Sequence, residues 1–407
     1  MGYRRAVIFS VPALMYFFSY FHRVSPAVLV YNLVELFSFR AALIGLISSA
    51  YFYSYAVAQI PVGILADSIG PKRTLKIFSL IMALGTLIFA FGSSEAVLIA
   101  GRALIGFGAG GIFIPALRLF SYWFKPGEYA TVTGMFMFSG NLGALFATAP
   151  LAIALGSLGW RGTMLSASLV IILSSILCHF FVGDSPVRKE ERREKISFFE
   201  ILKTVLRVKN FVLLYVIAFL VYGSLMIFQG LWGGRFLSDV YGFSRESSSL
   251  ILLLIALGVM LASPTGGFIS DRVIKRRKPV MVASSLLMFL SWIPLALLTS
   301  ELSKGMIYGV ALLMGISTGL RVIDMTIAKE SLPEEILGRG LGLLNISYFI
   351  GAAIFQPFIG VVMDAVLSER GSLLEAYHIA FTICLAASLI GLVLSLFLDE
   401  TTKNINN

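Results

Sequence analysis

The feature that most constrains the fold of this chain is a motif that occurs twice, half the chain apart. Residues 63–73 read Gly-Ile-Leu-Ala-Asp-Ser-Ile-Gly-Pro-Lys-Arg, and residues 267–277 read Gly-Phe-Ile-Ser-Asp-Arg-Val-Ile-Lys-Arg-Arg. The two aspartates, Asp67 and Asp271, are 204 positions apart by subtraction of their numbers. Self-similarity at a step of half the 407 residues indicates a duplicated unit.

Two further pairs of residues keep nearly the same step. Arg118 and Arg321, each near the end of an apolar stretch, are 203 positions apart, and Gly143 and Gly351 are 208 apart. The repeat therefore predicts two halves of related structure, an organisation that many membrane transporters share.

The composition places these halves in a membrane. The mean hydropathy is +0.89, and only 13% of the residues are charged, so a soluble domain of this size could not cover its apolar surface. Apolar runs of about 20 residues, the length that crosses a bilayer, recur along the whole chain. We predict an all-α membrane protein with twelve transmembrane helices in two pseudo-symmetric halves of six, at residues 6–30, 41–66, 74–93, 97–122, 130–155, 162–182, 210–236, 246–269, 279–300, 303–328, 338–366 and 376–398.

A polar stretch separates the two sets of six. The predicted parts are an N-terminal bundle at residues 1–182, a cytoplasmic linker at 183–209 and a C-terminal bundle at 210–407. Apolar residues after the charged part of the linker suggest a short amphipathic helix on the membrane face, and a solvated connection is the alternative.

The net charge of +10 follows the topology of the chain. If both termini are cytoplasmic, most of the 32 basic residues fall in inner loops, as the positive-inside rule requires. We therefore expect a multi-pass protein of the inner (cytoplasmic) membrane with both termini inside. Its surroundings are the lipid bilayer, and no nucleic acid is expected as a partner.

The sequence gives no sign of an enzyme. The chain has three histidines and two cysteines, without the spacing of a metal site, a nucleotide-binding glycine loop or a nucleophile–base pair. We expect no metal, no cofactor and a monomeric state.

The repeated motif resembles the signature loop of the major facilitator superfamily. Arg102 opens Arg-Ala-Leu-Ile-Gly-Phe-Gly in the fourth span, and Trp160-Arg161 follows the fifth, which is also similar to that superfamily. The second copy of the motif departs from the pattern, with Ile274 in the place of Gly70. The resemblance covers nearly the whole chain and implies a transporter that works by alternating access.

The first span carries a more specific resemblance. Residues 20–27, Tyr-Phe-His-Arg-Val-Ser-Pro-Ala, are similar to the Asp-Arg segment of the anion:cation symporter family, which includes bacterial sugar-acid and sialin-like transporters. The resemblance implies that Arg23 binds the carboxylate of the substrate, with Tyr20 as a weaker candidate on the same helix face. His22 replaces the family's acid. It is either a proton-coupling site or a neutral hydrogen-bonding group between helices.

Arg102 matches a second arginine of the same family, which implies that it also binds substrate. Two guanidinium groups in one cavity would suit a planar anion, because their fork geometry fits a carboxylate. The alternative is a structural role, in which Arg102 ties the fourth helix to the first. Gln229 and Trp232 of the seventh span are further candidates for substrate contacts, with glycine-dependent helix packing as the competing explanation.

The repeated charges suggest gating. Asp67, Arg118, Asp271 and Arg321 lie near the cytoplasmic ends of their spans and could form Asp–Arg pairs that brace the inner gate, although direct substrate binding by the arginines is an alternative. Asp324, one turn from Arg321, could share that pair or accept the coupling proton.

Together these features predict a secondary transporter of a small organic anion, a carboxylate or sugar acid, coupled to a proton or another ion by symport. Anion exchange, export of amphipathic or zwitterionic compounds, and a non-transporting membrane sensor are the alternatives.

Overall fold

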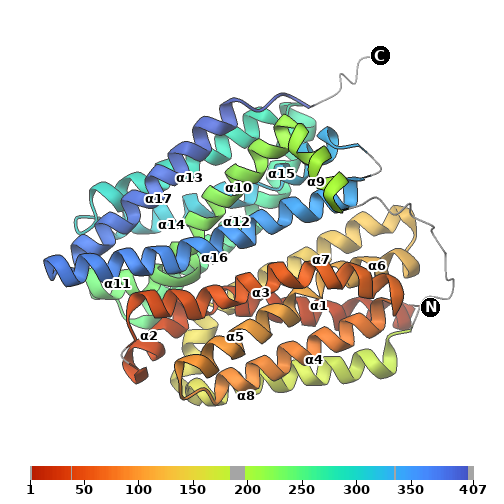
Figure 1. The fold of residues 1–407 in the computed structure, drawn as a ribbon, viewed down its shortest axis with the longest axis horizontal. Coiled ribbons are helices and arrows are strands. Elements are labelled where there is room, and N and C mark those ends of the chain that lie inside the picture. Colours follow the sequence, from red (N-terminus) through yellow and green to blue (C-terminus); the bar gives the residue numbers. More distant parts are fainter. Residues whose placement is uncertain (1, 38, 184–197, 334–335, 402–407) are drawn as a thin grey trace. The chain divides into compact units, whose positions relative to one another are not determined.

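The computed structural model describes residues 2–37, 39–183, 198–333 and 336–401, which form helices and connecting turns without a strand (Figure 1). The side chains of some positions within this range, Asp67 among them, are outside the description. The chain divides into two compact units, Met1–Arg192 and Arg193–Asn407. The division falls inside the polar segment that the sequence places between the two sets of spans.

The first unit contains eight helices among its described residues: α1 (Gly2–Val24), α2 (Pro26–Phe37), α3 (Ala41–Ser68), α4 (Pro71–Ala90), α5 (Glu95–Gly110), α6 (Phe113–Trp123), α7 (Pro126–Phe146) and α8 (Ala149–Phe181). Prolines open α2, α4 and α7, where the missing N–H costs nothing because the first turn of a helix has no intrahelical acceptor for it.

The second unit has the same character. Its described helices are α9 (Phe198–Arg207), α10 (Lys209–Ile227), a π-helical turn η1 (Phe228–Trp232), α11 (Gly233–Tyr241), α12 (Arg245–Phe268), a second π-helical turn η2 (Ile269–Val273), α13 (Lys278–Leu297), α14 (Lys304–Leu320), α15 (Ile323–Ser331), α16 (Leu337–Arg370) and α17 (Leu373–Leu396).

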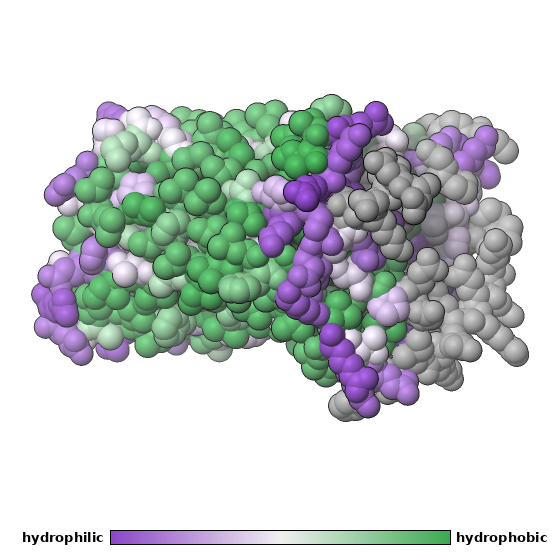
Figure 2. Space-filling model, turned by 90° about the horizontal axis from the view of Figure 1, so that it is seen from above, coloured by the Kyte–Doolittle hydropathy of each residue, from purple (hydrophilic) through white to green (hydrophobic). Residues whose placement is uncertain are grey.

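Eleven described segments are long and apolar enough to cross a membrane. One of them, α8, is divided at Gly159, whose φ of 68° and ψ of 177° are not helical. Its first part continues α7 and forms the fifth span, and the part after Gly159 is the sixth. With the fifth span added to the eleven, the twelve predicted spans are present. Large hydrophobic side chains lie exposed on the outer surface, as a lipid-facing surface requires (Figure 2).

Residues 184–197 of the predicted linker lie outside the described structure. The segment that follows forms α9, an amphipathic helix of ten residues. Its Ile201 and Val205 are buried, and α9 packs against α10 and α16 of its own unit. The apolar face of α9 therefore contacts protein at these two residues.

Glycine contacts make the internal repeat visible in three dimensions. A Cβ on Gly143 of α7 would lie 1.9 Å from the carbonyl oxygen of Phe17 in α1, and a Cβ on Gly351 of α16 would lie 2.3 Å from that of Phe219 in α10. In each unit, the backbone of one helix thus contacts the backbone of the other at a glycine, where no side chain separates them. By subtraction, the equivalent positions are 202 residues apart in the first and seventh spans and 208 apart in the fifth and eleventh.

The second and fourth spans repeat in the same way. A Cβ on Gly106 would meet the Tyr51 carbonyl oxygen at 2.1 Å, and one on Gly315 would meet the Ile255 carbonyl oxygen at 2.4 Å. The step is therefore 204 between Tyr51 and Ile255, as for the two motif aspartates, but 209 between the glycines of the fourth and tenth spans.

This larger step corrects one interpretation of the sequence. With a step of 209, the counterpart of Arg321 is Ile112 and the counterpart of Arg118 is Ile327. The two arginines, although 203 positions apart, do not occupy equivalent places in the two units.

Candidate functional site

The first span is broken next to the candidate arginine. Pro26 begins α2 and has no backbone N–H, so the carbonyl of His22 lacks the donor that a continuous helix would supply. The guanidinium of Arg102, on α5, donates to that carbonyl oxygen from Nη1 at 2.8 Å, and the Ser25 hydroxyl donates to it at 3.3 Å. Arg102 thereby supplies the hydrogen bond that the carbonyl of His22 lacks at the break in the helix.

The remaining contacts of Arg102 also lie inside the first unit. Its side chain is only 1% exposed, and its guanidinium lies 5.1 Å from the ring centre of Tyr51 and 5.9 Å from that of Phe89. Nη2 points to the Ser48 carbonyl oxygen at 3.5 Å. These contacts connect α5 with α1, α3 and α4 and favour the structural alternative for this residue.

His22 is held by the third span. Its Nε2 lies 3.1 Å from the hydroxyl of Thr86, which itself donates to the Met82 carbonyl oxygen at 2.8 Å. A hydroxyl has one proton to donate, so the Thr86 oxygen accepts from His22, and the imidazole proton is assigned to Nε2. His22 thus donates to Thr86 between the first and third spans, and a positive charge on its imidazole would be repelled by buried Arg102.

Arg23 lies in an aromatic setting. Its guanidinium carbon is 4.0 Å from the ring centre of Tyr20 and 5.5 Å from that of Tyr55, and the residue is 6% exposed. Stacking occupies a face of the guanidinium, whereas bidentate recognition of a carboxylate uses an edge, so the two are compatible. The predicted common face of Tyr20 and Arg23 is present.

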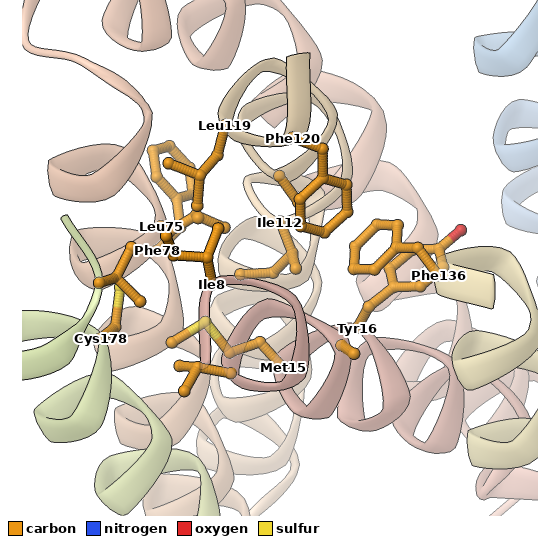
Figure 3. Close-up of a cluster of buried hydrophobic side chains, with 14 of the residues drawn as sticks. Ile8, Met15, Tyr16, Leu75, Phe78, Ile112, Leu119, Phe120, Phe136 and Cys178 are labelled. Atoms are coloured by element: carbon orange, nitrogen blue, oxygen red, sulfur yellow. The ribbon is translucent and has the colours of Figure 1, made fainter. Parts of the chain in front are cut away.

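The aromatic setting is continuous with the core of the unit. The Tyr16 hydroxyl donates to the Tyr20 hydroxyl at 3.3 Å, and the Tyr16 ring stacks on Phe136 of α7 at 4.4 Å. Figure 3 shows Tyr16 and Phe136 within the buried cluster that also includes Ile112 and Phe120. The core therefore fixes Tyr20, which in turn fixes the plane of Arg23.

The candidates of the seventh span lie in the π-helical turn η1. Gln229 is 5% and Trp232 is 3% exposed, and the indole nitrogen of Trp232 has no hydrogen-bond partner among the described residues. The π turn is closed by the hydrogen bond from the Gly233 N–H to the Phe228 carbonyl oxygen. Such turns often occur at functional sites.

The tenth span is broken between α14 and α15, and the break carries a buried ion pair. Arg321 Nη2 donates to Asp324 Oδ2 at 2.6 Å, and the Tyr348 hydroxyl of α16 donates to the same oxygen. Arg321 is 5% and Asp324 0% exposed. Tyr348 could not be identified from the sequence, because no local pattern indicates which face of a helix meets a partner 24 residues earlier in the chain.

Two of the predicted gating charges, Asp271 and Arg321, pair with residues of their own surroundings in the second unit. Asp271 is paired with Arg277 of its own motif, and Arg277 also binds Glu330 at 3.0 Å. Arg118 donates from Nε to the Tyr122 hydroxyl at 2.8 Å. Asp67 lies near the end of α3, and its side chain is outside the described part of the structure.

Two cavities in the described structure are not lined by Arg23, Gln229, Trp232 or Asp324. One of about 410 Å³ is bordered by Arg4, Ile8, Lys72 and Trp123. Ile8 and Arg23 are fifteen residues apart on α1, which is roughly 22 Å along a helix. In the part of the chain that the structure describes, no group of three or more His, Cys, Asp or Glu residues is arranged to hold a metal ion.

The family model of the Major Facilitator Superfamily matches residues 12–247 and, separately, residues 214–407. The chain belongs to the major facilitator superfamily. It is therefore a multi-pass membrane transporter and not an enzyme, as the sequence predicts.

Several relatives are named as transporters of anions. A probable sulfoacetate transporter of Cupriavidus necator is 26% identical over 97% of this chain and 94% of its own length. A hexuronate transporter of Bacillus subtilis is 27% identical over 59% of each chain. Among solved structures, a bacterial homologue of the human lysosomal transporter Spinster, inward-facing and unoccupied, matches with a TM-score of 0.78 at 19% identity, over 97% of this chain and 95% of that one.

Proposed function

We propose that this transporter moves a small organic anion, a carboxylate, sulfonate or sugar acid, across the inner membrane by alternating access in symport with a proton. The buried, tyrosine-stacked Arg23 at the break of the first span carries this proposal. Relatives that share nearly the whole chain or a large part of it are named for sulfoacetate and for hexuronates, which are anions of this class. The distribution of basic residues supports cytoplasmic termini.

The contacts suggest distinct roles for the candidate residues. Arg23 is the anion ligand of the first unit, Tyr20 orients it, and Gln229 and Trp232 supply contacts from the seventh span. Arg102 and His22 hold the broken first span in place, as their hydrogen bonds to helix groups support.

Asp324 is the better candidate for the coupling proton. It is the one carboxylate, among residues whose burial is described, that lies in the buried class. Buried acids inside a membrane are typical of proton pathways. Asp67, Arg118 and Asp271 remain proposed gating residues, and Arg321 is assigned to the proton site because it contacts Asp324.

The test is uptake by purified protein in liposomes, with sulfoacetate, glucuronate and glucose 6-phosphate as probes and with an imposed pH gradient, acidic outside. We expect accumulation of at least one probe that collapses with the gradient. Arg23→Ala should lower uptake about 100-fold, the effect of removing a buried charge partner, and Arg23→Lys should restore part of it. Arg235→Lys is the matched control. Arg235 is paired with Asp239, with Nε 2.8 Å from Oδ1, and we expect the variant to transport normally.

Two results would change this proposal. Full uptake by Arg23→Ala would remove Arg23 from the anion site. Uptake that depends on a preloaded internal anion and ignores the pH gradient would identify an exchanger instead of a symporter.

A further inference from the structure

The hydrogen bonding of Asp324 is uneven in a way that the proposed function does not explain. Oδ2 accepts from both Arg321 Nη2 and the Tyr348 hydroxyl. Oδ1 is buried and has no partner among the described residues, and neither do Nε and Nη1 of Arg321. One carboxylate oxygen and two guanidinium nitrogens of this buried pair therefore have hydrogen-bonding capacity that the surrounding side chains leave unused.

This asymmetry identifies the atom that a proton would occupy. Oδ2 already receives two donors, so an additional proton would add to Oδ1. The resulting neutral acid would attract the guanidinium much less, and Arg321 would be left buried without a counter-charge. A buried cation without a counter-charge is costly, so this state requires an anion beside Arg321.

The surroundings of Asp324 offer no substitute acid in the described part of the unit. Arg321, at the end of α14, acts on Asp324 by its charge and a hydrogen bond, and Tyr348, from α16, acts on it by a hydrogen bond. From α10, Tyr222 meets the Tyr348 ring edge-on at 5.4 Å. From α13, which also packs on α15, the buried polar side chains are those of Ser284, Ser285 and Ser291.

We propose that Arg321 exchanges its counter-ion during transport: a proton neutralises Asp324 at Oδ1, and the carboxylate or sulfonate of the transported anion takes its place beside Arg321. This inference rests on the proposed anion transport and adds the device that couples it to protons. One proton and one negative charge enter together, so the net charge of the cluster is the same in both states. Tyr348 is a positioning residue that keeps Oδ2 occupied.

The same unit contains a matched control. Arg235, Asp239 and Tyr377 repeat the three residue types. Arg235 Nε lies 2.8 Å from Asp239 Oδ1 and donates to Oδ2 at 2.9 Å, and the Tyr377 hydroxyl also donates to Oδ2, at 2.8 Å. The carboxylate of Asp239 thus has the cation close to both of its oxygens, and its side chain is 13% exposed, whereas Asp324 is 0% exposed. Asp239 lacks the open, fully buried oxygen of Asp324 and should take no part in coupling.

The first measurement counts protons. Sulfoacetate or glucuronate is added to the full-length protein in weakly buffered detergent solution, with binding followed by calorimetry and proton uptake by a pH indicator. The wild type and Asp239→Asn should take up about one proton per bound anion. At pH values where Asp324 is ionised, their affinity for the anion should fall about tenfold for each unit by which the pH rises. Asp324→Asn, which imitates the neutral acid, should bind without proton uptake and with an affinity independent of pH.

The second measurement needs no ligand. Infrared spectra of the ligand-free protein should show a carboxylic acid band that appears on acidification and is absent from Asp324→Asn. In Tyr348→Phe its midpoint should move to higher pH, because the variant loses a donor that stabilises the ionised carboxylate. Tyr377→Phe should leave the midpoint unchanged. This variant pair tests the protonation site even if Asp324→Asn fails to fold.

The outcomes separate the two proposals. Probe binding without proton uptake, or an infrared band that persists in Asp324→Asn, overturns the counter-ion exchange and leaves anion transport standing. No binding and no liposome uptake of the probes by the wild type overturns the proposed function, and the exchange falls with it because its anion is missing.

Discussion

The fourth and tenth spans are broken at equivalent places, yet only one of the two breaks carries charge. The fourth span is interrupted between α5 and α6 at residues 111–112, and the tenth between α14 and α15 at residues 321–322. With the step of 209, Ile112 corresponds to Arg321 and Pro115 to Asp324. Gly140, with the step of 208, corresponds to Tyr348. The first unit thus has apolar residues or glycine wherever the second has its ion pair and tyrosine.

The first and seventh spans show the opposite distribution. With the step of 202, His22 corresponds to Ser224 and Arg23 to Leu225, and Arg102 corresponds to Ala311 in the tenth span. Among residues whose burial is described, the first unit buries two guanidinium groups, and the second buries one together with an acid. The repeat has therefore kept the backbone contacts of the fold while the ionisable groups have become specific to each unit.

The largest effect on folding is expected at the glycine contacts that the two units share. Gly143→Leu and Gly351→Leu each place a side chain onto a carbonyl oxygen of the neighbouring helix, and we expect neither to yield folded protein by size-exclusion chromatography. Gly134 and Gly342, on the same two helices and also 208 apart, face open space. Their alanine variants should be as stable as the wild type or up to about 1 kcal/mol more stable. A monodisperse Gly351→Leu protein would show that the two helix contacts are not equivalent.

The next effect is confined to the second unit. Replacing Arg321 or Asp324 alone by Ala should lower the free energy of unfolding by about 3–5 kcal/mol, because the remaining charge is buried without its partner. The double variant Arg321→Met, Asp324→Leu should recover much of that loss while abolishing coupled transport. Thermal unfolding in detergent measures both. Equal losses in the single and double variants would argue against a buried pair.

Arg102 gives the corresponding test in the first unit. Arg102→Gln should lower the free energy of unfolding by about 1.5–3 kcal/mol, since a charged donor to the His22 carbonyl is lost. We expect anion affinity to be retained in the folded fraction. Reduced affinity at unchanged stability would instead place Arg102 in the anion site.

A smaller effect is expected from Thr86→Val, which removes the acceptor of the His22 imidazole. The loss should be about 1 kcal/mol, the usual contribution of a hydrogen bond. The pH dependence of transport should stay that of the wild type, because the proposed proton site lies in the second unit. A shifted pH profile would bring His22 back as a coupling residue.

The smallest change in stability is predicted for Asp271→Asn. The side chain of Asp271 is 57% exposed, so its pair with Arg277 should contribute less than about 1 kcal/mol. If Asp271 acts in gating, turnover in liposomes should fall while anion binding stays intact. Normal turnover would leave the motif with a purely structural role.

Much of the fold and part of the site could be predicted from the sequence. Span lengths follow from hydropathy, and the shared face of Tyr20 and Arg23 follows from helical spacing. The Gly143/Gly351 echo proved to mark equivalent helix contacts.

Two kinds of information were not available from the sequence alone. The step of the repeat changes from 202 to 209 along the chain as connections differ in length, so equal spacing wrongly paired Arg118 with Arg321. The partners Thr86 and Tyr348 belong to other helices, and contacts between helices depend on how each one is rotated about its axis. Local periodicity does not determine that rotation when a helix is apolar on most sides.

The glycine contact between α1 and α7, and its counterpart between α10 and α16, also define rulers for spectroscopy. Backbone touching backbone leaves these helix pairs no room to slide, so spin labels placed on the outer faces of one pair should keep a constant separation throughout turnover. Such a doubly labelled protein would serve as an internal standard, because a change in its distance distribution reports loss of native packing and not a step of the cycle.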